Sequence, residues 1–342
     1  MRILWYTVRQ CLIFGEMIKM LMNTLCALAV GFVLDSLLGD PQWSAYPLNI
    51  VKKLLCGLDI RIKHAYSDEP DARNAAGGMY EFLAIMIVGL ASAAAIIVSY
   101  FVSDILGILV EGVMCWSAIS VRSPKELCTR IMHAAKADDI KAAREYFNEL
   151  TGMDASGLEM TDIVRCTLEA SSANITDNAV APIFWIGLFG GAGGLIYRTV
   201  NLADRIGGRL GGYEDRSGNK PSAVNRFFSL VPAKIAASLC KSSGSFLLLD
   251  AKCGDQTYRY FRHDSQNKTA AHTQAVCAGL LGCSIDSGYP NGRKMILGDE
   301  DNEPDANCIY WVNQLVTGAE VSLVFIVAVI RVGLFIAFKQ LF

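Results

Sequence analysis

The stretch Tyr80–Phe101, which reads YEFLAIMIVGLASAAAIIVSYF, decides the class of fold. Its residues 82–101 carry no charge. A helix of about 20 apolar residues spans the hydrocarbon core of a bilayer, and a helix pairs its backbone polar groups internally. The stretch predicts a transmembrane helix, and we expect an all-α, multi-pass helical membrane protein with polar helical and loop segments.

The composition of the 342-residue chain favours the same class. Hydrophobic residues make up 52% of the chain, charged residues 19%, and the mean hydropathy is +0.33, whereas soluble domains carry about 25% charge. The net charge is −2 and no basic stripe stands out, so nucleic acid is not an expected partner. We expect a multi-pass protein of the cell membrane (inner or plasma) that contacts membrane lipid.

Four further segments are apolar enough to be predicted as spans. With the first, the predicted spans lie near 20–38, 80–101, 179–197, 222–249 and 319–338. Residues 1–19 are predicted as an N-terminal extension or interfacial helix, followed by one membrane domain over 20–342. The stretch 104–121 contains Asp104 and Glu111, and is either a return helix or a helix packed against protein.

Glycines interrupt the third predicted span. They are Gly187, Gly190, Gly191, Gly193 and Gly194. Glycine permits either close helix packing or a break that turns the chain back at membrane depth. Arg331, inside the last span, needs a partner or a route to the interface. These two features also raise the hypothesis of a small-solute transporter, although no inverted repeat is visible.

Three polar helices are predicted between the spans. Ser123-Pro124-Lys125-Glu126 is a capping box that predicts a helix to about residue 136. Asp138 or Asp139 is expected to cap a second helix that stops near Gly152. A third helix is expected to open at 161 or 162 and to run to about residue 173.

An N-x-x-D pattern occurs on both sides of the glycine-rich span, as Asn174–Asp177 and Asn201–Asp204. This spacing puts amide and carboxylate on one helix face. If the chain folds back at the glycines, both pairs meet and offer ligands for Mg²⁺ and a phosphate-bearing molecule. If it spans straight through, they lie on opposite sides. Ordinary capping at helix ends is the alternative.

Four other polar residues are candidates for the site. Asp35 and Asp40 close the first span and place carboxylates at the interface; the alternative role of Asp40 is to cap a turn before Pro41. Glu169 is either a surface charge or part of the site. Arg198 either snorkels to the interface or binds a phosphate or carboxylate.

Short motifs in a fixed order cover roughly residues 22–330. They include LDSLLGDP at 34–41, Asn174–Asp177, VAPIFW at 180–185, YRTVNLADRIG at 197–207, VPAK at 231–234 and AGLLG at 278–282. Their order and spacing resemble the adenosylcobinamide-phosphate synthases, which are multi-pass membrane proteins of cobalamin biosynthesis.

The resemblance implies an amide ligase that uses ATP and Mg²⁺. Its partners would be a corrinoid, adenosylcobyric acid, and aminopropanol phosphate or ethanolamine phosphate. Other cobalamin-pathway membrane enzymes are possible partners. The implied catalytic residues are Glu169, Asn174, Asp177, Arg198, Asn201 and Asp204, with Asp177 and Asp204 as metal ligands and Asp35 and Asp40 as substrate-binding residues.

Several positions differ from the family pattern. The usual E-x-x-A-E-N has Ala173 in place of its second acid, and the D-G that follows becomes Asp177-Asn178. These departures motivate an alternative function. The chain would then be a catalytically inactive paralogue that binds corrinoid or scaffolds partner enzymes in the membrane.

Overall fold

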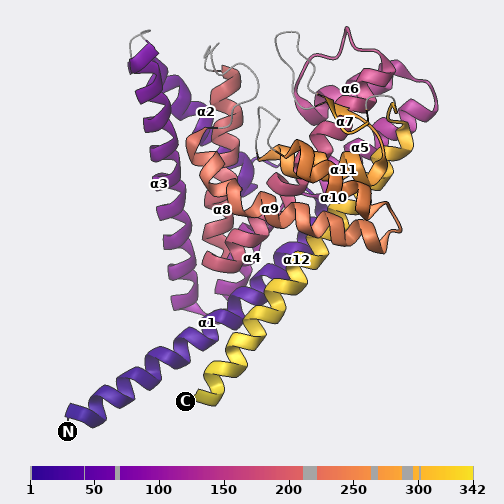
Figure 1. The fold of residues 1–342 in the computed structure, drawn as a ribbon. Helices are drawn as coiled ribbons and strands as arrows, with labels where there is room; N and C mark the ends of the chain where they lie inside the picture. Colours follow the sequence, from indigo (N-terminus) through magenta and orange to yellow (C-terminus); the bar gives the residue numbers. More distant parts are fainter. Residues whose placement is uncertain are drawn as a thin grey trace.

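The computed structural model describes residues 2–41, 43–65, 70–210, 222–262, 269–286, 296–299 and 302–341. Within these ranges the chain is almost entirely helical (Figure 1). The elements are α1 (Arg2–Leu38), α2 (Pro47–Ala65), α3 (Pro70–Val102), α4 (Asp104–Ala118), α5 (Arg122–Lys136), α6 (Ile140–Thr151), α7 (Met160–Asn174), the π-helical turn η1 (Ile175–Val180), α8 (Ala181–Leu210), α9 (Ala223–Phe246), α10 (Ala251–Phe261), α11 (Ala270–Leu281), a minimal antiparallel pair β1 (Ile285–Asp286) and β2 (Ile296–Leu297), and α12 (Ala306–Leu341).

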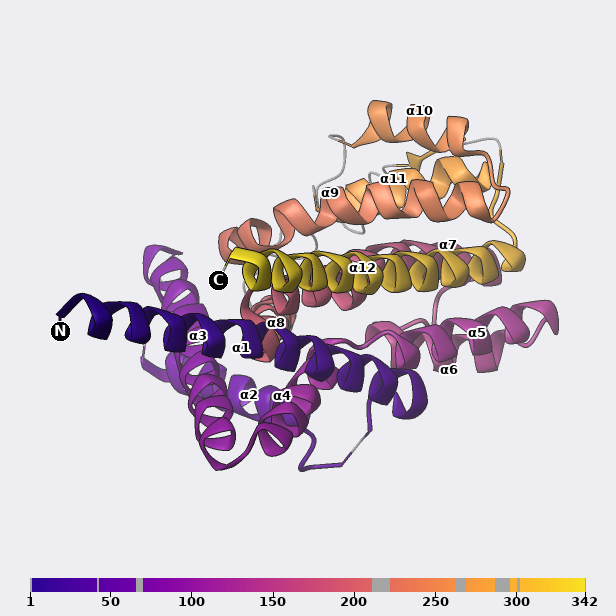
Figure 2. The same ribbon diagram turned by 90° about the horizontal axis from the view of Figure 1, so that it is seen from below.

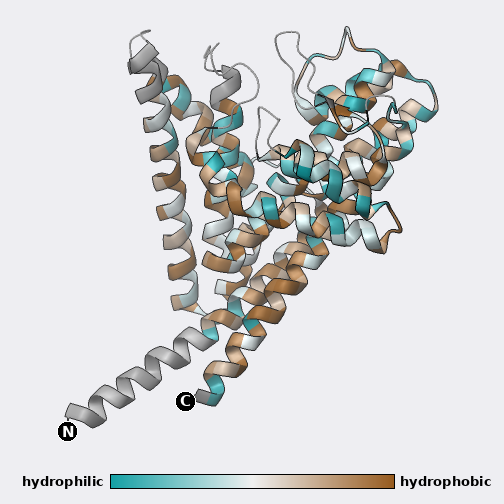
Figure 3. Ribbon diagram, viewed as in Figure 1, coloured by the Kyte–Doolittle hydropathy of each residue, from teal (hydrophilic) through white to brown (hydrophobic). Residues whose placement is uncertain are grey.

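Five helical segments of the described chain are long and apolar enough to cross a membrane. They are Lys19–Leu38, Ala76–Val102, Asp104–Lys136, Met160–Ile206 and Ala306–Gln340. In Figure 3 hydrophobic residues dominate the lower parts of α3 and α12, whereas hydrophilic residues gather in the helices at upper right. The predicted all-α, multi-pass membrane fold is confirmed.

Three segments differ from the predicted set of spans: 222–249, 104–121 and 179–197, the last of which is broken at Gly190. The segment 222–249 forms α9, which is not among the five, because Arg226, Lys234 and Lys241 lower its hydropathy. The stretch 104–121, which is not among the predicted spans, forms α4, and this helix packs against α1, α3 and α8. Residues 2–19 continue α1 without a break rather than forming a separate helix.

The shorter helices α5, α6, α7, α10 and α11 gather at one end of the molecule (Figure 1). Asp139 caps α6 by accepting from Ala142 N, and Gly152 ends it with φ +67°, as predicted. The helix predicted from Ser123 begins one residue earlier, at Arg122. Ser123 does not cap it, because its hydroxyl oxygen accepts from the Asp40 amide at 2.7 Å instead.

The glycine-rich segment turns the chain back on itself. Gly190 has φ +72° and ψ −166°, which interrupts α8. Arg198 Nη1 donates to Asn178 Oδ1 at 2.5 Å, and Arg205 lies 3.4 Å from Asp177. A straight helix would separate 177 from 205 by roughly 40 Å. The segment is a hairpin with its tip at Gly190, so it is not one straight span.

Two ionised side chains satisfy the backbone at this tip. Arg331 donates to the carbonyls of Gly187 at 2.9 Å and Ile186 at 3.3 Å, where the first arm ends, and to Leu21 O at 3.1 Å. Glu111 accepts from Gly191 N at 3.0 Å, where the second arm begins. A cation at a helix C-terminus and an anion at an N-terminus are both favourable. Arg331 therefore has a structural role that needs no transport function.

The tip leaves no room for side chains. A Cβ on Gly190 would lie 2.5 Å from Glu111 Oε1, and one on Gly194 would lie 2.4 Å from Ile186 Cγ1.

Viewed from below, α12 runs between α9 and α1 (Figure 2), both of which it contacts. The last helix thus carries Arg331 to the hairpin tip.

Replacing Arg331 with Met is expected to destabilise the fold by about 2 kcal/mol, because buried carbonyls lose their donors. The measurement is thermal unfolding of the detergent-purified protein. Lys339→Met is the matched control, because Lys339 is exposed near the end of the same helix. Equal unfolding temperatures for the two variants would contradict the capping role of Arg331.

Candidate functional site

A cavity of about 600 Å³ opens among the polar ends of the helices. It is lined from α2, α5, α6, α7, η1, α8 and α11 and from the segments that follow α1, α4 and α6. The residues used below are Asp40, Lys52, Ser120, Glu169, Asn174, Asn178, Arg198, Arg205 and Gln274. Its size lies in the range of small-molecule sites.

The Asp40 carboxylate is fixed on one wall by hydroxyl groups. Tyr46 Oη donates to its Oδ1 at 3.1 Å, and the Ser120 hydroxyl donates to its Oδ2. Trp116 Nε1 donates to Gly39 O at 2.9 Å, which anchors the turn that precedes Asp40. Burial and the charge of Asp40 raise the pKa of Tyr46, so the phenol stays protonated as a donor.

Three cationic side chains face the same cavity. Lys52 comes from α2, and Arg198 and Arg205 come from the second arm of the hairpin. Arg198 is 6% exposed, and its buried Nε has no hydrogen-bond partner. Lys52 is exposed to the open cavity, yet partial burial and the charges of Arg198 and Arg205 lower its pKa. This concentration of positive charge suits a phosphate or carboxylate.

The hairpin brings some of the predicted residues together and leaves others outside. Glu169, Asn174, Arg198 and Asp40 line the cavity. Asn178, not predicted, joins them through its bond to Arg198. The two N-x-x-D segments lie close together, as expected if the chain folds back at the glycines. Asp35, Asp177, Asn201 and Asp204 do not line this cavity.

Asp177 and Asp204 are both engaged by protein donors. Asp177 accepts from Tyr197 Oη at 3.3 Å and lies 3.4 Å from the Arg205 guanidinium. Asp204 accepts from Ser222 N and Asn225 Nδ2, both at 2.8 Å, and so ties α8 to the start of α9. No group of three or more His, Cys, Asp or Glu in the described chain is placed to hold a metal. In this arrangement the two carboxylates do not form an open metal site, and their role as Mg²⁺ ligands stays a prediction.

The remaining two predicted residues are buried. Asn201 is 1% exposed, and its Oδ1 has no partner. Asp35 is also 1% exposed and lines a second cavity, on the other face of α5.

Lys52 and Gln274 are cavity residues that sequence reasoning missed. Gln274 lies on α11, whose residues Ala270–Leu280 are all buried. A polar triplet, His272-Thr273-Gln274, in such an apolar helix was an available signal, because buried polar groups need partners. Lys52 gave no such signal, since one basic residue beside another in a polar helix is ordinary.

The family model described as CobD/Cbib protein matches residues 28–316. The chain belongs to this family. It is 25% identical over 291 residues to "Cobalamin biosynthesis protein CobD" of Clostridium perfringens, covering 84% of this chain and 91% of the relative. A protein of the same name from Geobacter metallireducens is 25% identical over 305 residues, which are 87% of this chain and 93% of the relative. The "Probable cobalamin biosynthesis protein CobD" of Pyrococcus abyssi is 24% identical over 314 residues, 92% and 99% of the two chains.

No solved structure matches the chain. Membership of the CobD/Cbib family gives the protein a role in cobalamin biosynthesis.

For this CobD/Cbib protein, anion binding in the cavity is expected to weaken as the pH rises through the lowered pKa of Lys52. The loss should therefore begin below the ordinary lysine value of 10.5. Bound anion favours the charged lysine, so deprotonation costs affinity. Calorimetric titration of ATP between about pH 7 and about pH 9.5 would measure this.

Lys52→Arg should remove the loss, because arginine stays charged throughout this range. Lys53→Arg is the control, since the exposed Lys53 does not line the cavity. The same pH profile in the wild type and in Lys52→Arg would refute a contact between Lys52 and the anion.

Proposed function

We propose that the protein joins adenosylcobyric acid to an amino-alcohol phosphate by an ATP-dependent amide bond, giving adenosylcobinamide phosphate in the cell membrane. The observation that carries the proposal is the cavity, where Lys52, Arg198 and Arg205 face the carboxylates Asp40 and Glu169. Family membership supports the pathway, and the resemblance of motifs supports the reaction.

The chemistry explains why such a cavity is needed. A carboxylate is a poor electrophile and does not condense with an amine unaided. Attack of the propionate oxygen on the γ-phosphorus of ATP expels ADP and leaves an acyl phosphate. The amine nitrogen then bonds to the acyl carbon, the bond from that carbon to the phosphate oxygen breaks, and the nitrogen loses a proton. Both transfers develop negative charge on phosphate oxygens.

The chain's own residues are suited to these demands. Arg198 and Arg205 would bind phosphate oxygens, and Lys52 would add a mobile positive charge. Glu169 and Asn174, one turn and a half apart on α7, would position the reacting groups from the facing wall. A volume of about 600 Å³ suits phosphate groups and a propionate arm, so the corrin ring would lie at the mouth.

Mg²⁺ is expected to enter with ATP, because it is usually held by substrate phosphates and one or two carboxylates. When bound it would neutralise phosphate charge. Asp40, Glu149 and Glu169 are the carboxylates that line the first cavity. To bind the metal, the predicted ligands would have to give up their present contacts. These are the contact of Asp177 with Arg205 and the hydrogen bonds of Asp204 with the amide groups of Ser222 and Asn225.

The test supplies membranes containing the protein with ATP, Mg²⁺, adenosylcobyric acid and aminopropanol phosphate or ethanolamine phosphate. The amide product is followed by chromatography and mass. Glu169→Gln and Arg205→Gln are each expected to lower kcat/KM at least tenfold, because each removes a charge from the cavity. Glu159→Gln is the control, since Glu159 is exposed just before α7. Full activity in both cavity variants would defeat the site assignment.

A second candidate is a catalytically inactive paralogue that binds corrinoid or scaffolds partner enzymes. The engagement of Asp177 and Asp204 by protein donors favours it, because a lost metal site would leave them so. Corrinoid binding without amide product would select it, provided that a family member with intact motifs makes product in the same preparation.

A further inference from the structure

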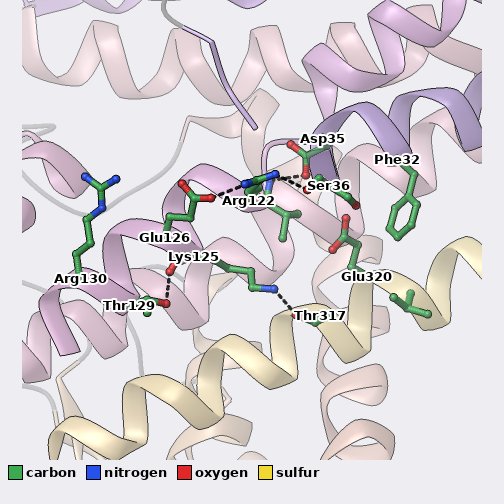
Figure 4. Close-up of a pocket in the computed structure, with 12 residues that line it drawn as sticks. Phe32, Asp35, Ser36, Arg122, Lys125, Glu126, Thr129, Arg130, Thr317 and Glu320 are labelled. Atoms are coloured by element: carbon green, nitrogen blue, oxygen red, sulfur yellow. Dashed lines mark hydrogen bonds and ion pairs between the residues drawn. The ribbon is translucent and has the colours of Figure 1, made fainter. Parts of the chain in front are cut away.

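A second cavity of about 610 Å³ lies between α1, α5 and α12 (Figure 4). It is separated from the first by α5 itself. Ser123 and Leu127 face the first cavity, whereas Lys125 and Thr129 face the second. Glu320 extends from α12 toward the end of α1, where Asp35 lies (Figure 4).

Two buried carboxylates in this cavity each have an oxygen without a partner. Asp35 is 1% exposed and Glu320 is 4% exposed. Asp35 Oδ1 and Glu320 Oε1 accept no hydrogen bond, while the other oxygen of Asp35 accepts from Val121 N at 3.3 Å. A buried carboxyl oxygen without a hydrogen-bond partner is costly. These two atoms therefore point to a ligand that supplies donors.

The charged groups that line the cavity balance, which favours a ligand with both a positive and a negative charge. The acids are Asp35, Glu126 and Glu320, and the bases are Arg122, Lys125 and Arg130, of which Lys125 donates to Thr317 Oγ1. Arg122 and Glu126 pair with each other at 2.6 Å. Arg130, at the exposed side, lies over the Tyr146 ring at 5.8 Å and leaves its charge near the cavity.

A primary ammonium fits these groups better than a metal ion does. It carries one charge and three donors, which match Asp35 Oδ1, Glu320 Oε1 and the neighbouring hydroxyls. Mg²⁺ prefers six oxygen ligands and would be repelled by Lys125. The volume also exceeds what an ion needs. The arginines on α5 would favour an anionic group on the same molecule.

We propose that this cavity binds a small anionic primary amine, with Asp35 and Glu320 accepting hydrogen bonds from its ammonium group. Identifying this ligand as the amino-alcohol phosphate rests on the proposed amide formation. The second cavity would then hold the amine before the reaction, and the amine would have to pass α5 to reach the acyl phosphate in the first cavity.

The test is calorimetric titration of the purified protein with 1-amino-2-propanol O-phosphate, without ATP or corrinoid. Propyl phosphate, which lacks the amine, is expected to bind at least about tenfold more weakly. Glu320→Gln and Asp35→Asn should each weaken amine binding at least about tenfold. Glu303→Gln, whose side chain is 70% exposed, should bind as the wild type does. The contrast between the two probes uses the wild type alone, so it holds even if a variant folds poorly.

Equal binding of both probes, or unchanged binding in a folded Glu320→Gln, would overturn the inference. If amine binding were lost in Glu169→Gln but kept in Glu320→Gln and Asp35→Asn, the amine would belong in the first cavity, which would also overturn the inference. Glu320-dependent binding without amide product would support this site and defeat the ligase. Amide product with an unchanged KM for the amine in Glu320→Gln would keep the ligase and defeat this site.

Discussion

The architecture depends on how backbone polar groups are satisfied where the chain reverses at Gly190. A break at membrane depth exposes the last carbonyls of one helix and the first amides of the next, and lipid offers them no partner. Arg331 supplies donors to the carbonyls of Ile186 and Gly187, and Glu111 accepts from Gly191 N. Arg331 and Glu111, two charged residues that would be unfavourable in apolar helices without partners, therefore stabilise the hairpin.

The hairpin in turn creates the candidate site. It places Asn174 and Asn178 on one arm beside Arg198 and Arg205 on the other, within the layer of polar helices. A straight helix would have sent these groups to opposite sides of the bilayer. The cavity is thus a consequence of the reversal, and its positive charge comes largely from the returning arm.

α5 divides the polar end of the molecule into two compartments. The segment that leads into it binds Asp40 through Ser120 and Asp35 through the Val121 amide. The two acids of the LDSLLGDP motif therefore lie on different sides of one wall. The motif is contiguous in the sequence, but in the fold it contributes one acid to each of the two cavities.

The repeated N-x-x-D pattern illustrates how far sequence reasoning reaches. It correctly marked two segments that meet, and Asn174 lines the first cavity. It gave no means of distinguishing Asp204, which holds the start of α9, from Asp40, which faces the cavity. Sequence reasoning missed Glu320, because the sequence around a single acid in an apolar helix reveals neither how deeply the side chain is buried nor which residues surround it.

By itself the sequence determined the helical class, the polar helices and three of the five predicted spans, near 20–38, 80–101 and 319–338. It could do so because hydropathy and capping residues act over a few neighbouring positions. The tertiary structure decided which way the chain turns at Gly190, what Arg331 binds, and which acids face a cavity. It also showed that 222–249 is not among the helices apolar enough to span. These outcomes depend on contacts between residues that are far apart in the chain, such as Arg331 and Gly187, 144 positions apart. Local sequence patterns do not encode such pairings, because a side chain's partner is set by how whole helices pack.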